Sequence, residues 1–124
     1  MTDELVAELR RIVGDDWVVT DLSLMESYLV DVTALPVRPV PSSDVVVVKP
    51  ADAQEISQIL RLANDRLVPV VPRGGGTGCV GAVIPTQGGI VMSLERLDRI
   101  IEVDTFTGYS LLCMAEAMPR PTVC

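Results

Sequence analysis

Four consecutive valines at positions 45–48 constrain the fold of this chain more strongly than any other feature. Asp44 and Pro50 flank the run as turn residues, so the segment is too short for a helix, and valine favours strands. An unbroken apolar run, as opposed to an alternating one, is typical of a parallel strand that is buried on both faces. We therefore predict a buried strand over residues 44–50.

A helix is predicted directly after this strand. Residues 51–65 repeat apolar side chains at helical spacing, and Asp52 lies three residues before Glu55. An acidic residue followed three positions later by glutamate is typical of a capped helix N-terminus. The sequence thus predicts a strand followed by an amphipathic helix.

Further strands are predicted at residues 67–74, 89–94 and 100–104. Pro69 and Pro72 should limit the ladder of the first of these strands to an edge of the sheet or to the ends of the strand, because proline has no N–H to donate. The first two strands and the helix between them form a βαβ unit, in which we expect adjacent parallel strands and a right-handed crossover.

The N-terminal part is predicted to be helical. Residues 3–13 have helical apolar spacing, Thr2 is a suitable N-cap, and Gly14 is a suitable terminator. A second short helix is expected within residues 21–31. Three prolines in residues 35–44 then indicate an extended connection.

Composition excludes several classes of function. The net charge of −7 disfavours nucleic acid as a partner. The chain has no histidine, and its three cysteines lack CxxC spacing, so we expect no zinc site and no catalysis by a serine–histidine or cysteine–histidine pair. No apolar stretch approaches the length of a membrane span and the N-terminus is acidic, so we expect a cytoplasmic protein.

The clearest candidate site is a glycine cluster, because residues 70–81 contain five of the nine glycines in the chain. Successive amides in such a loop can bind an anion, and Arg73 could add positive charge; a tight connector is the alternative. Residues 76–81 match GxGxxG, but Pro85 and the Gly88-Gly89 pair prevent the helix that a dinucleotide fingerprint requires. The Walker Gly-Lys-Ser/Thr sequence is also missing. The sequence therefore predicts a diphosphate held by loop amides alone.

These residues resemble a known family. Residues 45–78, ending in RGGGTG, and the later segment VIPTQGGIVMSLERLDRIIEVD resemble the start of the FAD-binding domain of FAD-linked oxidases. The domain that they resemble is of the vanillyl-alcohol oxidase and p-cresol methylhydroxylase (PCMH) type. Within this type, the sequence is most similar to the glycolate oxidase and D-lactate dehydrogenase branch. Tyr28 and Asp31 match a Y-x-x-D pattern that often precedes the proline-rich connection in that branch.

The resemblance implies non-covalent FAD, since no histidine is present for a histidyl linkage; a thioether at Cys79 is the less favoured alternative. Ala82 departs from the glycine pair that relatives usually have after GGGTG, which could weaken affinity. No residue is assigned as catalytic and none as a metal ligand. The residues implied to contact FAD are Pro72, Arg73, Gly74, Gly75, Gly76, Thr77, Gly78, Cys79, Val80, Gly81 and Ser93.

The resemblance also implies an α+β fold, a small βαβ-containing FAD-binding subdomain with about four strands and two to three helices. Residues 1–43 are assigned to a helical region and proline-rich connector, 44–104 to the first lobe, and 105–124 to an atypical truncated tail. A second FAD-binding lobe and a substrate-binding cap domain are expected to be missing. A partner chain or self-association is expected to cover the face that the second lobe would occupy.

The expected function is the FAD-binding portion of a flavin-dependent oxidoreductase that acts on 2-hydroxy acids such as glycolate or D-lactate. Because no catalytic base can be named, the chain alone is expected to be incomplete and inactive as an enzyme. Two alternatives are a non-catalytic interaction module that kept the fold and lost the cofactor, and a different phosphate-binding domain such as a nucleotide sensor.

Overall fold

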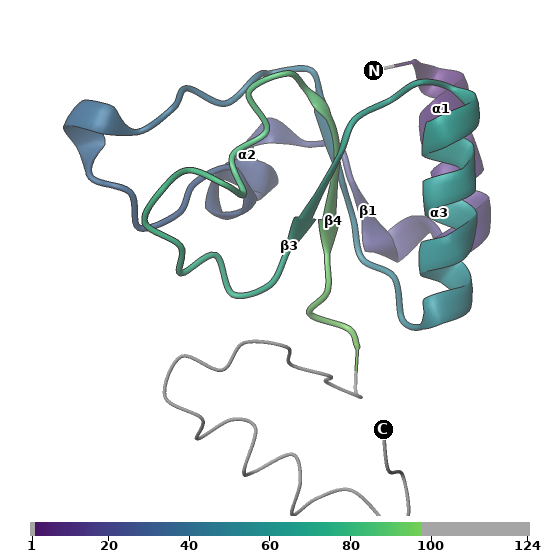
Figure 1. The fold of residues 1–124 in the computed structure, drawn as a ribbon. Coiled ribbons are helices and arrows are strands. Elements are labelled where there is room, and N and C mark those ends of the chain that lie inside the picture. The colour runs from purple at the N-terminus through teal and green to yellow at the C-terminus, as the bar shows by residue number, and fades with distance from the viewer. Residues whose placement is uncertain (1, 98–124) are drawn as a thin grey trace, which may run out of the picture.

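A four-stranded sheet carries two helices on one face and an irregular segment on the other (Figure 1). The computed structural model describes residues 2–97, and the strand and tail expected at 100–104 and 105–124 lie outside this range. Its elements are α1 (Asp3–Val13), β1 (Val18–Val19), α2 (Leu22–Met25), β2 (Val45–Val48), α3 (Ala53–Asp65), β3 (Val70–Arg73) and β4 (Gly89–Ser93), with 3₁₀ turns at Asp15–Trp17, Glu26–Tyr28 and Leu35–Val37.

Helix α1 begins and ends where the sequence predicts. The hydroxyl of Thr2 accepts a hydrogen bond from the amide of Leu5 at 3.4 Å. Gly14 ends the helix with a φ of +91°, and its amide donates to the carbonyl of Arg10 at 2.8 Å. The N-cap and the terminating glycine are therefore confirmed.

Helix α3 has the predicted acidic cap, with one difference in detail. Asp52 Oδ1 accepts from the amide of Glu55 at 2.8 Å, which satisfies one of the free donors of the first turn. The carboxylate of Glu55 accepts from the amide of Ala51 at 2.7 Å, one residue before the cap. A standard capping box would place that second hydrogen bond on the cap residue itself.

The C-terminus of α3 is a Schellman motif with leucine in the left-handed position. Leu67 has a φ of +53°, and its amide donates to the carbonyl of Asn64 at 3.2 Å. The amide of Val68 donates to the carbonyl of Ala63 at 2.8 Å, which completes the motif. The Leu67 side chain is 90% exposed, so no burial offsets the strain of this conformation.

The strand order is β1-β2-β4-β3, which corrects one expectation. Strands β2 and β3 point in the same direction but are not neighbours, because β4 lies between them and is parallel to both. The prediction that the two strands of the βαβ unit are adjacent is therefore wrong. Pro69 and Pro72 are accommodated as predicted, because among the described strands β3 is an edge strand whose one partner is β4.

Two further differences concern the N-terminal region. The two-residue strand β1 pairs antiparallel with β2 and was not predicted. The helix expected within residues 21–31 is limited to the four residues of α2 and the 3₁₀ turn that follows.

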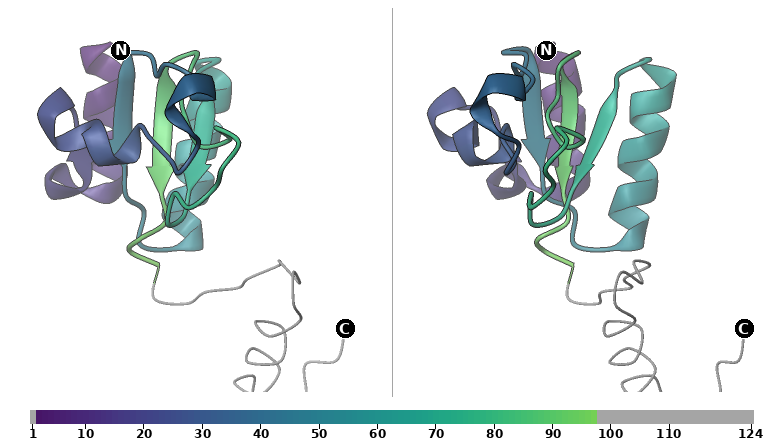
Figure 2. Two further views of the ribbon diagram at one scale, coloured as in Figure 1. Left: turned by 90° about the vertical axis from the view of Figure 1, so that its left-hand side faces the viewer. Right: turned by 60° about the vertical axis from the view of Figure 1, so that its left-hand side comes forward.

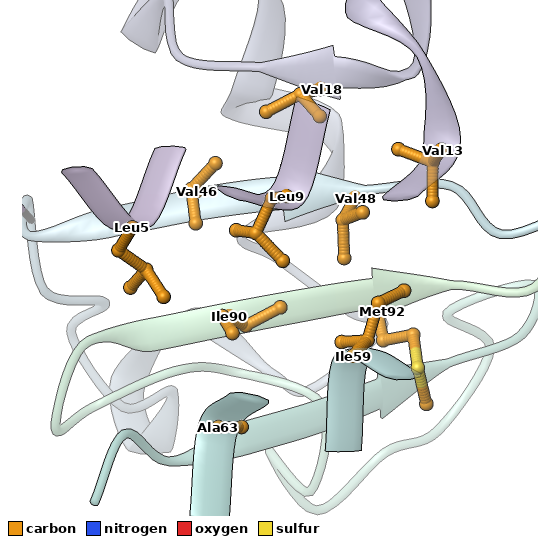
Figure 3. Packing of buried hydrophobic residues seen from close by; sticks show 10 residues of the cluster. All are labelled: Leu5, Leu9, Val13, Val18, Val46, Val48, Ile59, Ala63, Ile90 and Met92. Carbon is orange, nitrogen blue, oxygen red and sulfur yellow. The ribbon is translucent and has the colours of Figure 1, made fainter. Parts of the chain in front are cut away.

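The sheet is buried on both faces, which explains the unbroken valine run of β2. Side chains at alternate positions of β2 and β4 pack with α1 and α3, and the others pack with the segment that contains α2. Figure 2 shows the two helices on one face of the sheet and this segment on the other. The helix-side cluster, shown in Figure 3, consists of Leu5, Leu9, Val13, Val18, Val46, Val48, Ile59, Ala63, Ile90 and Met92. The opposite cluster consists of Met25, Leu29, Val45, Val47 and Val91.

Candidate functional site

The candidate site is the glycine loop, residues 74–81, which leaves the carboxyl end of β3. The three parallel strands end at the same edge of the sheet, where Arg73 pairs in register with Ser93. Ligands of parallel α/β sheets bind at this edge. The loop lies on the side of the sheet opposite α1 and α3, beside the β1–β2 connection, residues 20–44 (Figure 1).

The backbone amides of the loop are largely unpaired. Within residues 2–97, none of the amides of residues 74–80 donates a hydrogen bond to a protein group. The amide of Gly81 differs, because it donates to Asp31 Oδ2 at 2.9 Å. Consecutive amides without protein partners are what an anion-binding backbone loop offers to its ligand.

The fold itself requires glycine at two positions of the loop. Gly76 has a φ of +66°, and a Cβ there would overlap the guanidinium of Arg73. Gly81 has a φ of +75°, and a Cβ there would lie 2.7 Å from Cγ of Pro39. Larger residues are excluded at both positions by backbone conformation and by close neighbours.

The fold of the described residues does not require glycine at the other three positions of the loop. None of Gly74, Gly75 and Gly78 has a positive φ. A Cβ on Gly74 would meet nothing within 4 Å, and on Gly75 or Gly78 the nearest atom would lie at 3.7 or 3.8 Å, an ordinary contact distance. Glycine at these positions keeps the surface of the backbone open, which suits the close approach of a ligand to the amides.

The side chain of Arg73 is committed to the β1–β2 connection. It is only 8% exposed, and its two terminal nitrogens donate to the carbonyls of Val30 at 2.8 Å and Ser27 at 2.7 Å. This arrangement anchors the first residue before the loop. That Arg73 also adds charge to a bound phosphate stays a prediction.

Asp31 anchors the other end of the loop. Its Oδ1 accepts from the amide of Thr33 and its Oδ2 from the amide of Gly81, both at 2.9 Å. The amide of Val32 donates to the carbonyl of Gly78 at 3.0 Å, so the two segments run side by side. The nearby Thr33 hydroxyl and the hydrogen bonds from the amides of Thr33 and Gly81 outweigh desolvation and lower the pKa of Asp31.

A second polar cluster lies at the same edge of the sheet. Lys49 Nζ contacts Glu95 Oε1 at 2.7 Å and lies 4.8 Å from the ring centroid of Tyr28, whose hydroxyl donates to the same carboxylate. Burial alone would lower the pKa of Lys49, but the hydrogen bonds to Glu95 and Tyr28 outweigh it and raise the pKa. Burial alone would likewise raise the pKa of Glu95, and hydrogen bonds from Lys49, Ser93 and Tyr28 lower it.

The remaining residues implied by the resemblance are placed as follows. Ser93 is 1% exposed and donates to Glu95 Oε2 at 3.1 Å. Pro72 is exposed on the edge strand, and Thr77, Cys79 and Val80 are exposed in the loop. Cys79 is a free thiol. Their contact with a cofactor stays a prediction.

Sequence reasoning missed the contacts that hold the loop in place. It noted Asp31 only through the Y-x-x-D resemblance, and it did not foresee the carbonyls of Ser27 and Val30 as acceptors. The one local signal is the spacing of Asp31 and Thr33, which permits an aspartate side chain to accept the amide two residues later.

The described part of the chain, residues 2–97, contains neither a membrane-spanning helix nor a metal-binding cluster. None of its helices has the length and apolarity needed to cross a membrane. Between residues 2 and 97, no three cysteine, aspartate or glutamate side chains gather closely enough to ligate a metal ion.

Comparison with known proteins identifies the family. The FAD binding domain family matches residues 45–110 of this chain. The D-lactate dehydrogenase of Archaeoglobus fulgidus is 44% identical over 79 residues, which are 64% of this chain and 18% of that protein. The glycolate oxidase subunit GlcD of Bacillus subtilis is 41% identical over 58 residues, which are 47% of this chain and 12% of that protein.

A solved structure shows the same fold. The structure of p-cresol methylhydroxylase with substrate bound aligns with a TM-score of 0.63 over 84% of this chain and 20% of that chain, at 19% sequence identity. This chain therefore spans a fifth or less of the length of each protein described above. The α+β fold of the p-cresol methylhydroxylase type and the FAD cofactor, both expected from the sequence, are confirmed. The chain belongs to the FAD binding domain family of FAD-linked oxidoreductases.

Proposed function

We propose that the glycine loop binds the diphosphate of FAD through its backbone amides. The observation that carries this proposal is that, within residues 2–97, the amides of residues 74–80 have no protein partners. Beside them are three glycines at which a Cβ would meet no atom closer than an ordinary contact distance. These residues fit a diphosphate, because its oxygens need several donors and close access to the backbone. When bound, FAD supplies the hydride acceptor, and the chain holds it in place.

The loop would hold the diphosphate without a helix dipole. The next regular element after the loop is β4, and residues 82–88 contain no helix. Positive charge at the site would then come from the partial charges of oriented amides, which do not depend on the net charge of the chain. The net charge of −7 is therefore compatible with binding of a small anionic group.

We further propose that the complete oxidoreductase acts on 2-hydroxy acids such as lactate or glycolate. This substrate class is suggested by the names of the relatives, a D-lactate dehydrogenase and a glycolate oxidase subunit. No described residue is assigned as a base for the substrate. The contribution of this chain is to bind and orient the cofactor.

Titration of the 124-residue chain with FAD tests the proposal, with quenching of flavin fluorescence as the readout. The wild type is expected to bind, and Gly75→Val is expected to abolish binding, because its side chain would occupy the open surface beside the amides. Ser57→Val is a matched control, since Ser57 is exposed on α3, on the opposite face of the sheet. Equal FAD affinity in the wild type and Gly75→Val would refute the proposed site.

An interaction module is the second candidate function, favoured by one specific observation. Large apolar side chains are exposed along the β1–β2 connection, at Leu24, Val32, Leu35, Val37 and Val40. Exposed apolar surface of this kind is typical of a contact with another protein surface. Sedimentation velocity, together with the FAD titration, distinguishes the two candidate functions. A stable dimer that does not bind FAD would favour the interaction module.

A further inference from the structure

We propose that Asp31 is a positioning residue for the FAD loop. It holds the amide of Gly81 and the backbone around it, so that the loop keeps a binding shape in which the preceding amides stay free. This inference rests on the proposed function of the glycine loop. It assigns to the β1–β2 connection a direct part in building the cofactor site.

A local hydrogen bond orients the carboxylate of Asp31 independently of the loop. Its Oδ1 accepts from the amide of Thr33, two residues later, which forms a local turn that sets the direction of the side chain. Its Oδ2 accepts from the amide of Gly81, fifty residues along the chain. Asp31 is only 7% exposed, so the group acts as a rigid acceptor inside the protein.

The contacts of Asp31 lie directly beside the candidate cradle. A Cβ built on Gly78 would lie 3.8 Å from Asp31 Oδ2, so the carboxylate is adjacent to the middle of the loop. The neighbouring Val32 amide donates to the Gly78 carbonyl, which turns that carbonyl toward the β1–β2 connection. The carbonyl of Gly78 is thereby hydrogen-bonded within the chain, and the amide of Gly81, three residues later, is held by Asp31.

Together with Arg73, Asp31 fixes the loop at both ends. Arg73 binds the carbonyls of Ser27 and Val30 just before the loop, and Asp31 binds the last residue of the loop. A loop with five glycines in eight positions would otherwise sample many conformations, and ordering them would oppose ligand binding. Fixing both ends in advance reduces this cost.

Asp31 places a negative charge beside the proposed diphosphate site. Its positioning role and its repulsion of the diphosphate therefore predict opposite changes in FAD affinity when the carboxylate is removed. Through Coulomb repulsion alone, Asp31 would weaken FAD binding, and its removal would strengthen it. The positively charged neighbour is Arg38, whose Nε donates to the carbonyl of Thr33 at 2.9 Å and whose charge helps to keep Asp31 ionised. If positioning dominates over repulsion, removal of the carboxylate weakens binding instead.

The experiment compares Asp31→Ala and Asp31→Asn with the wild type by titration with FAD, and with ADP as a smaller diphosphate probe. We expect Asp31→Ala to weaken binding of both probes about tenfold or more. Asparagine keeps one acceptor oxygen, so Asp31→Asn should show a smaller loss. Asp21→Ala is the matched control, because Asp21 accepts the amide of Ser23 in the same local way, but at the exposed start of α2.

Hydrogen exchange of the Gly81 amide provides a readout that needs no ligand. We expect this amide to be protected in the wild type and to exchange faster in Asp31→Ala, with the core amides of β2 and β4 unchanged. Equal or tighter FAD binding in Asp31→Ala, with the wild type binding normally, would overturn the positioning role and leave the proposed function intact. If the wild type binds neither probe, the proposed function fails, and the exchange of Gly81 still decides whether Asp31 holds the loop.

Discussion

Replacement of Gly76 by alanine should destabilise the domain by about 2.5–4 kcal/mol, whereas the same change at Gly75 should alter its stability by less than about 0.5 kcal/mol. The two positions are neighbours in the same loop and receive the same side chain. They differ in backbone conformation and in what the new methyl group would meet. The comparison therefore separates a glycine that the fold requires from one that it does not.

The magnitude at Gly76 has two parts. Its φ of +66° is left-handed, which costs an alanine about 1 kcal/mol. The new Cβ would also overlap the guanidinium of Arg73, which must then leave at least one of the carbonyls of Ser27 and Val30. Loss of one hydrogen bond from a charged donor costs about 1.5–3 kcal/mol.

Urea unfolding followed by far-UV circular dichroism measures both variants against the wild type under identical conditions. At Gly75 the methyl group would lie 3.7 Å from Cγ2 of Thr77, at an ordinary contact distance, so the native state has no reason to change. An equal loss of stability in the two variants, or none at Gly76, would refute the role assigned to Arg73 beneath the loop.

Two further predictions concern stability. Leu67→Gly should raise the free energy of unfolding by about 0.5–1 kcal/mol, because glycine relieves the left-handed strain at φ +53°. The leucine side chain is 90% exposed, so its loss costs little burial. A drop in the thermal midpoint of unfolding would contradict this prediction. The lowered pKa of Asp31 means that its ionised form stabilises the fold fully above about pH 4 and that this contribution is lost as the pH falls through the lowered pKa. The stability difference between wild type and Asp31→Asn should therefore shrink on acidification, as measured by urea unfolding at a series of pH values, and a constant difference would argue against it.

The elements that sequence reasoning predicted well carry local signals. The Thr2 and Asp52 caps, the terminating Gly14 and the four-valine strand each depend on residues a few positions apart. The edge position of β3 also follows from local chemistry, because Pro72 within the strand has no N–H to donate to a second neighbour. At the site, the glycine cluster indicated where the candidate loop lies, and its binding of an anion stays a prediction.

The features that sequence reasoning missed depend on pairings between distant segments. Strand β1 has only two residues, too few for any periodicity, and its partner β2 defines it. Strand β4 lies between β2 and β3 in the sheet, and no local sequence pattern predicts this strand order. Asp31 and Gly81 are fifty residues apart, so the contact that anchors the glycine loop could not be read from either segment alone.

The central position of β4 has a consequence for how the chain can fold during synthesis. Of the described strands it is the last to leave the ribosome, yet it provides the only described partner of β3 and one of the two neighbours of β2. A nascent chain that stops before Gly89 would therefore expose two unpaired strand edges, which favour aggregation. Parallel pairing of this sheet must wait until the glycine loop has been made, so the glycine loop and the sheet core are completed together.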